Sequence, residues 1–177
     1  MKPPLTIETA RLRLRKPVMD DADLIFERYA KDPDVTRYLS WQPPESVEQT
    51  RDFVKRCLSD WKDDFVFPYV ITLKEDDQPI GTIEIRIEGH RGEIGFALAK
   101  GNWGKGYMTE AAQAITDWAL KQDGIYRVQA CCDLENRASA RVLEKIGMQR
   151  EGVLRRWGMH PNLTGEPRDV YLYARVK

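Results

Sequence analysis

The sequence has little of several residue types on which common functional sites depend. Its 177 residues include two histidines, His90 and His160, which leaves little material for a histidine-rich metal site or a histidine-dependent catalytic triad. The three cysteines, Cys57, Cys131 and Cys132, are an odd number without CxxC spacing. They predict neither a disulfide framework nor a zinc knuckle, and we expect no metal site.

The chain also lacks an excess of charge and a long apolar run. It has 28 Lys and Arg against 28 Asp and Glu, whereas nucleic-acid and anionic-membrane binders need a large basic excess. No run approaches the roughly 18 apolar residues of a membrane helix, and Met1–Pro4 lacks the apolar core of a signal peptide. We therefore expect a cytoplasmic protein with no nucleic-acid or membrane partner.

What the chain does have is the composition of one folded domain. Hydrophobic residues make up 42% and charged residues 32%, a balance typical of globular proteins. The length is close to the roughly 150 residues of an ordinary domain, and no internal repeat or composition break divides it. We expect a single domain over residues 1–177.

Hydrophobic periodicity predicts seven strands and four helices. The strands are expected at about residues 9–15, 67–73, 79–87, 93–99, 126–132, 148–155 and 169–176, and the helices at about 20–31, 46–61, 107–122 and 136–146. A loop is expected over residues 34–44. The resulting order, β-α-α-β-β-β-α-β-α-β-β, favours an α/β (mixed α+β) fold with a mixed sheet flanked by helices.

The most informative stretch is the loop over residues 101–111, between a predicted strand and a predicted helix. Two glycines spaced by one residue, Gly104 and Gly106, let the backbone approach a ligand, and the unpaired amides at the helix start can bind phosphate oxygens. The spacing fits neither a nucleotide P-loop nor a dinucleotide fingerprint. A strand-to-helix turn without a ligand is the alternative, and Gly-x-Gly alone favours it.

A second candidate is the helix that starts near Asn136. Helical spacing places Ser139 on one face with Val142, Leu143 and Ile146, so that its hydroxyl points inward. Taken alone, Asn136 is more often a helix N-cap and Ser139 a small core residue.

Together the two segments resemble the GNAT acetyltransferase superfamily, in particular its RimJ/RimL-like branch of ribosomal-protein N-terminal acetyltransferases. Matching segments run along nearly the whole chain, at residues 9–15, 20–22, 32–39, 103–107, 135–139 and 168–172. The resemblance implies a GNAT-like fold with a seven-stranded, mostly antiparallel mixed sheet and about four helices. It also implies acetyl-CoA as the acetyl donor and a primary amine as the acceptor.

The resemblance further implies which residues hold acetyl-CoA. Pantetheine would lie beside a strand edge and the pyrophosphate on the loop before the third helix, with an Asn and a residue near the sulfur on the later helix. Carried over, these are Phe96, Ala97 and Leu98, then Trp103, Gly104, Lys105, Gly106, Tyr107, Met108 and Thr109, and finally Asn136 and Ser139. Met108 departs from the family pattern, in which Gly or Ala is usual.

Acetyl transfer requires a neutral amine, although α-amino and lysine amino groups have reference pKa values near 8 and about 10.4. Glu93 is the candidate base, directly or through water. Strand alternation places it with Gly95, Ala97 and Ala99, and a solvent-facing or salt-bridged glutamate is the alternative. Ser139 could hydrogen-bond the leaving sulfur, because a thiolate with a pKa of about 8.5 leaves without a strong acid. Many members of the family use a Tyr there, which is absent here.

The acceptor side of the site is expected in two loops. Tyr38 and Trp41 could form one wall with Glu93, or could simply cover the core. The loop from Gly158 to Pro167, with His160 and Glu166, could form the other wall. Candidate acceptors are a protein N-terminal α-amine, a small amine or an amino acid, and a homodimer would be ordinary.

Three functions remain open at this point. The leading hypothesis is an enzyme that transfers acetyl from acetyl-CoA to an amine by direct attack in a ternary complex. A non-catalytic acyl-CoA-binding module would keep the cleft without the acceptor chemistry. An interaction domain without a ligand would not be stabilised by CoA.

Overall fold

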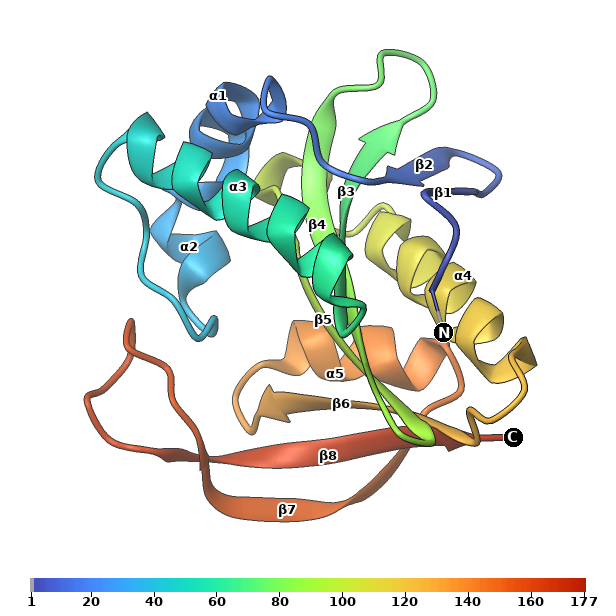
Figure 1. The fold of residues 1–177 in the computed structure, drawn as a ribbon. Helices are drawn as coiled ribbons and strands as arrows, with labels where there is room; N and C mark the ends of the chain where they lie inside the picture. Colours follow the sequence, from blue (N-terminus) through green and yellow to red (C-terminus); the bar gives the residue numbers. More distant parts are fainter. Residues whose placement is uncertain (1) are drawn as a thin grey trace.

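The computed structural model describes residues 2–177, which form one open, mixed sheet with helices on both of its faces (Figure 1). The strands are β1 (Thr6–Glu8), β2 (Leu12–Arg15), β3 (Val66–Leu73), β4 (Pro79–Glu88), β5 (Arg91–Leu98), β6 (Arg127–Asp133), β7 (Gln149–Gly158) and β8 (Arg168–Val176). They lie in the order β1-β2-β3-β4-β5-β6-β8-β7. The predicted fold class is confirmed.

The expected number of seven strands is wrong, because the sheet has eight. The additional strand is β1, which pairs antiparallel with β2 and matches Thr6 with Arg15 and Glu8 with Arg13. Three residues are too few for a period of two to be recognised in the sequence. The eighth strand is therefore recognised from its pairing with β2 in the structure and not from the sequence pattern.

The helices are α1 (Asp21–Ile25), α2 (Pro33–Thr36), α3 (Val47–Asp63), α4 (Tyr107–Lys121) and α5 (Arg137–Lys145), with a π-helical turn at Phe26–Ala30 and a 3₁₀ turn at Lys100–Asn102. The expectation of about four helices is thus corrected to five. The fifth is α2, within the predicted loop. Asp32 caps it by accepting a hydrogen bond from the Asp34 amide, and Pro33 occupies its first turn, as is common at helix starts.

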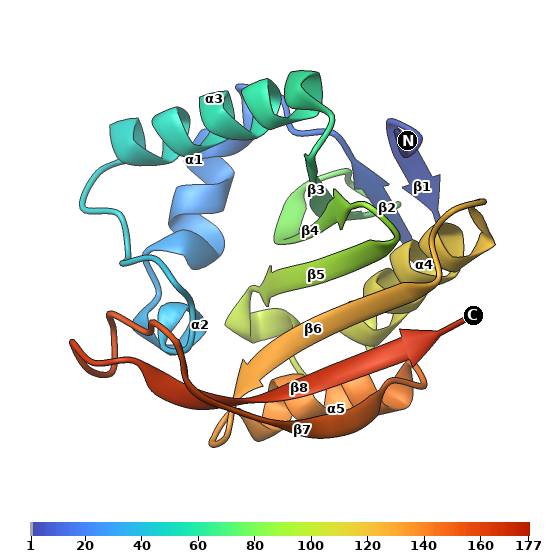
Figure 2. The same cartoon turned by 60° about the horizontal axis from the view of Figure 1, so that its bottom comes forward.

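The two faces of the sheet are covered by different helices (Figures 1 and 2). Isoleucines of β4 such as Ile83 and Ile85 pack in one buried cluster with Ala111 and Ile115 of α4. On the other face, β3 and β5 pack against α1 and α3 in a second cluster: Ala22, Ile25, Val54, Val70, Ala97 and Ala99. The C-terminal half of β5 therefore has a packed helix layer on each side.

The neighbours β5 and β6 are the one parallel pair in the sheet of the described residues, and they separate early. Pairing runs from Arg91 with Arg127 to Glu93 with Gln129 and ends there, although β5 continues to Leu98. On its other edge β5 stays paired with β4 up to Leu98, without a bulge. The sheet thus opens between β5 and β6 beyond Glu93, and Figure 2 shows the two strands diverging.

Within residues 2–177, no helix combines the length and the apolar character needed to cross a membrane.

Candidate functional site

A cleft of about 720 Å³ lies at the open end between β5 and β6. Four segments line it: α2 with the residues that follow it, the end of β5, the glycine loop with the start of α4, and one side of α5 from its start to Lys145. The cleft contains most of the residues expected to hold acetyl-CoA, namely Phe96, Ala97, Leu98, Trp103, Gly104, Gly106, Tyr107, Met108, Thr109, Asn136 and Ser139. Lys105 belongs to the same loop but does not line the cleft.

The glycine loop has the backbone geometry that its sequence predicts. Gly104 and Gly106 have φ values of 74° and 79°, in the left-handed region that side chains with a Cβ avoid. The first intrahelical bond of α4 is donated by the Glu110 amide to the Gly106 carbonyl, so the amides of Tyr107, Met108 and Thr109 precede it. Such amides favour anions at a helix N-terminus.

Arg11 holds this loop from outside, a role that the sequence analysis missed. Its guanidinium donates to the Lys105 carbonyl at 3.0 Å and to Glu110 at 2.7 Å, and it lies over the Tyr107 ring at 4.6 Å. Burial opposes ionisation of Glu110, but hydrogen bonds from Thr9 and Arg11 outweigh it and lower the pKa of that carboxyl. The charge of this carboxylate beside the glycine loop is therefore matched by Arg11.

Trp103 is anchored to the end of β5. Its indole Nε1 donates to the Leu98 carbonyl at 2.7 Å, while 45% of the residue stays exposed. The contact joins the loop to the strand edge that lines the cleft. The loop and the end of β5 consequently form one surface.

Asn136 and Ser139 lie together at the start of α5. The Asn136 side chain caps the helix, because its Oδ1 accepts a hydrogen bond from the Ser139 amide at 3.1 Å. Burial raises the pKa of the nearby Cys132 thiol to about 12, against the lowering effect of Ser139. The N-cap interpretation of Asn136 is confirmed, and the same side chain still lines the cleft.

Glu93 lies where β5 and β6 stop pairing, outside the lining of the cleft. Its Oε2 accepts a hydrogen bond from Gln129 Nε2 at 2.9 Å, and its Oε1 lies 3.7 Å from Arg86 Nη1. The side chain is 42% exposed. The register places Glu93 opposite Arg86 and Gly95 opposite Glu84, so these four residues share one face of the sheet.

The two expected acceptor walls are tied together by Asn162, which sequence reasoning did not single out. Its Nδ2 donates to the Thr36 carbonyl at 2.7 Å and to the Trp41 carbonyl at 2.8 Å. Tyr38 lines the cleft, whereas Trp41 does not. The loop between β7 and β8 is therefore fastened to the segment that follows α2.

The base of that loop rests on a buried carboxylate. Asp133 accepts hydrogen bonds from Arg168 at 2.6 Å and from the Glu135 amide at 2.9 Å. Burial would raise its pKa, but these hydrogen bonds and nearby positive charge lower it. His160 is buried, with Nε2 at 3.7 Å from the Asp133 carboxylate. Glu166, at the far end of the loop, pairs with Arg156 on the surface.

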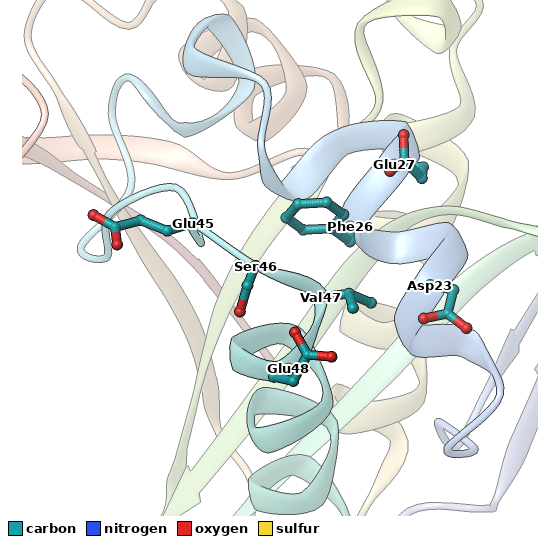
Figure 3. Close-up of a pocket in the computed structure, with 7 residues that line it drawn as sticks. All are labelled: Asp23, Phe26, Glu27, Glu45, Ser46, Val47 and Glu48. Carbon is teal, nitrogen blue, oxygen red and sulfur yellow. The ribbon is translucent and has the colours of Figure 1, made fainter.

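A second hollow of about 480 Å³ lies between α1 and the start of α3 (Figure 3). Four carboxylates surround Phe26 there: Asp23, Glu27, Glu45 and Glu48. Arg51 pairs with Asp23 and Glu48, and Lys31 pairs with Glu27. Three of the four carboxylates thus have an ion-pair partner, and two cations supply these partners. Across residues 2–177, no three His, Cys, Asp or Glu side chains gather as metal ligands would.

Comparison with known proteins agrees with this geometry. Residues 11–149 match the family model described as acetyltransferase (GNAT) domain. The uncharacterized N-acetyltransferase p20 of Bacillus licheniformis is 33% identical over 175 residues, which cover 97% of this chain and 96% of that protein.

Solved structures show the same fold. An acetyltransferase of the GNAT family from Bacillus anthracis superposes with a TM-score of 0.84 and 32% identity, covering 97% of this chain and 98% of that one. RimL, a ribosomal L7/L12 alpha-N-protein acetyltransferase in complex with coenzyme A, superposes with a TM-score of 0.85 over 97% of each chain. At 24% identity, the second likeness establishes the fold alone.

Proposed function

This chain belongs to the GNAT acetyltransferase family and is an acyltransferase, and from that premise we propose how it moves acetyl from acetyl-CoA to a primary amine. The amine attacks the thioester directly while both substrates are bound. The observation that carries the proposal is the glycine loop, whose helix-start amides face a cleft beside the open edge of β5. The relatives' names do not favour a non-catalytic acyl-CoA-binding module.

The cleft offers the donor set that an acyl-CoA needs. A Cβ on Gly104 would meet nothing within 4 Å, which leaves room for a diphosphate beside the amides of residues 107–109, with Lys105 adding positive charge. Phe96 to Leu98 would run along the pantetheine, and backbone amides there would polarise the thioester carbonyl. Trp103, Asn136 and Ser139 would complete the wall.

Proton transfer is assigned to side chains around the opening of the sheet. We assign to Glu93 the removal of a proton from the acceptor ammonium, directly or through a water molecule. Ser139 would hydrogen-bond the leaving sulfur. Because a thiolate with a pKa of about 8.5 leaves without a strong acid, a hydroxyl suffices for this role.

The acceptor would enter between Tyr38, Trp41 and the loop between β7 and β8. A protein N-terminal α-amine is one candidate class, supported by the likeness in fold to RimL, and a small-molecule amine is the other. A cytoplasmic location, the absence of nucleic-acid and membrane partners, a homodimer and the single domain remain predictions from the sequence.

Release of the CoA thiol from acetyl-CoA, measured across a panel of amines, tests the function. The panel contains a peptide with a free N-terminus, the same peptide with its N-terminus blocked, a polyamine and an amino acid. We expect thiol release with at least one free amine and none with the blocked peptide. Tight CoA binding without release on any amine would favour the binding module. At 100 times its dissociation constant, CoA should stabilise the fold by about 2.7 kcal/mol. The absence of any stabilisation would contradict both the enzyme and the binding module.

A further inference from the structure

The pairing of β4 with β5 brings a second carboxylate to the open edge of the sheet. Glu84 lies directly opposite Gly95, the residue before Phe96, which is the first β5 residue to line the cleft. Glu93 lies three residues before Phe96, or about 10 Å along a strand. Glu84 is therefore level with the open part of β5, whereas Glu93 is level with the last β5–β6 pair.

The missing side chain of Gly95 gives Glu84 access to this edge. A Cβ on Gly95 would contact Glu84 Cγ at 3.7 Å and its Oε1 at 3.8 Å, so the carboxyl group lies over the Gly95 backbone. The Glu84 side chain is 42% exposed. Glu84 does not itself line the cleft, but no side chain of Gly95 stands between its carboxylate and the opening between β5 and β6.

Glu84 and Glu93 differ in the contacts that their carboxylates make within the protein. Gln129 donates a hydrogen bond to Glu93. For Glu84 the contact in the described chain is an ion pair with Arg86, whose Nη2 lies 3.6 Å from Oε1. Arg86 also faces Glu93 at 3.7 Å. Glu84 is consequently the freer of two carboxylates that share one cation.

The surroundings of Glu84 make it a better base than an ordinary glutamate. Burial raises its pKa, and the negative charges of Asp60 on α3 and Glu93 on β5 add to that, against the lowering effect of Arg86. On its other edge, β4 pairs Glu84 with the uncharged Pro68 of β3. A base works best when its pKa approaches the working pH.

We propose that Glu84 is a second catalytic carboxylate of this site, which binds the acceptor ammonium beside the opening between β5 and β6 and shares with Glu93 the removal of its proton. This inference rests on the proposed function. Glu93, held by Gln129 at the point where the strands separate, lies beside the same opening. Arg86 keeps the two carboxylates from repelling each other when no amine is bound.

Each turnover forms one C–N bond and breaks one C–S bond. The ammonium gives one proton to the Glu84 carboxylate, and the neutral nitrogen forms a C–N bond to the acetyl carbonyl carbon. The C–S bond then breaks, the nitrogen loses a second proton, and the leaving sulfur takes one proton. Glu84 returns its proton to water, so each turnover releases one proton.

The test compares Glu84→Gln with Glu93→Gln and with Glu88→Gln, a control at an exposed glutamate on the same strand that pairs with Arg91. We expect Glu84→Gln to lower kcat about tenfold or more at pH 7, because a positioned base contributes on the order of 100-fold or more. The loss should shrink as rising pH deprotonates the free amine. The dissociation constant for acetyl-CoA should change by no more than about twofold, because Glu84 does not line the cleft. A tenfold change would correspond to about 1.4 kcal/mol.

A kcat and pH profile of Glu84→Gln equal to those of Glu88→Gln, in a parent that turns over, would overturn this inference and leave the proposed function intact. A parent that releases no thiol on any amine would instead contradict the proposed function. Carboxyl NMR titration of the parent gives a second readout that needs no variant. We expect the pKa of Glu84 to lie above the ordinary value of a glutamate side chain, and a midpoint at or below that value would also overturn the inference.

Discussion

Arg11 and Glu110 join the start of β2 to the first turn of α4 across 99 residues of sequence, through the Arg11 amide at 2.8 Å and its Nε at 2.7 Å from the carboxylate. The same guanidinium holds the Lys105 carbonyl. The glycine loop is thus held by a residue outside it.

Arg11→Ala should weaken acetyl-CoA binding about tenfold, which corresponds to about 1.4 kcal/mol. The variant frees the Lys105 carbonyl and leaves the Glu110 charge unmatched beside the expected phosphates. Isothermal titration with CoA measures the effect. Arg13→Ala is the control, because Arg13 pairs with Glu8 and Asp77 instead. Equal affinities for the two variants would show that Arg11 does not organise the loop.

Gly106→Ala should lower both stability and CoA affinity. At φ of 79° an alanine is strained by about 1–2 kcal/mol, and its Cβ would meet the Arg11 guanidinium at 3.5 Å. Gly101→Ala is the matched control in the same segment, since Gly101 has no positive φ and a Cβ there meets nothing within 4 Å. Thermal melts with and without CoA compare the two variants. A Gly106→Ala protein that binds CoA like the control would contradict the proposal that the glycine loop binds the diphosphate.

Asn162→Ala should affect the acceptor and spare the donor. The variant loses both hydrogen bonds to the Thr36 and Trp41 carbonyls, each worth about 1 kcal/mol, and so releases the loop between β7 and β8. We expect KM for the amine to rise about fivefold or more, with KM for acetyl-CoA unchanged. Thr164→Ala, in the same loop, is the control. If KM rises for both substrates alike, the loop does not serve the acceptor side alone.

Asp133→Asn should destabilise the fold by about 3 kcal/mol at pH 7, because breaking a buried ion pair leaves its partner uncompensated. The folded-state pKa of Asp133 lies below its unfolded value, so its contribution is complete above about pH 4 and is lost as pH falls through the folded pKa. Urea unfolding of parent and variant should therefore converge in acid.

The control for this series is Asp52→Asn on α3, where an exposed ion pair with Lys55 should contribute within about 0.5 kcal/mol. A constant difference between parent and Asp133→Asn from pH 7 to pH 2 would show that the lost stability is not the charge of Asp133.

Local signals in the sequence predicted the parts of the site that are contiguous. Gly104 and Gly106 adopt the left-handed backbone that their spacing suggests, and Asn136 caps α5 as its residue type favours. Asp32 and Pro33 are also residue types typical of a helix start, although the sequence predicts a loop over residues 34–44. A four-residue helix is too short for its periodicity to be seen.

Contacts between distant segments cannot be predicted from local signals in the sequence. Nothing in the sequence indicates that Asn162 would hold the Thr36 carbonyl, 126 residues away, or that Arg11 would hold the glycine loop. The register of β4 against β5 places Glu84 over Gly95. A shift of that register by one residue would turn Glu84 to the opposite face.

The sequence by itself determined the family, the glycine turn before α4 and the cap of α5, because backbone preferences and helix-end chemistry act over a few neighbouring residues. Only the tertiary structure decided where β5 and β6 separate and which carboxylates face that opening. Strand order and register depend on how the two helix layers pack against the sheet, and that packing is settled by the chain as a whole.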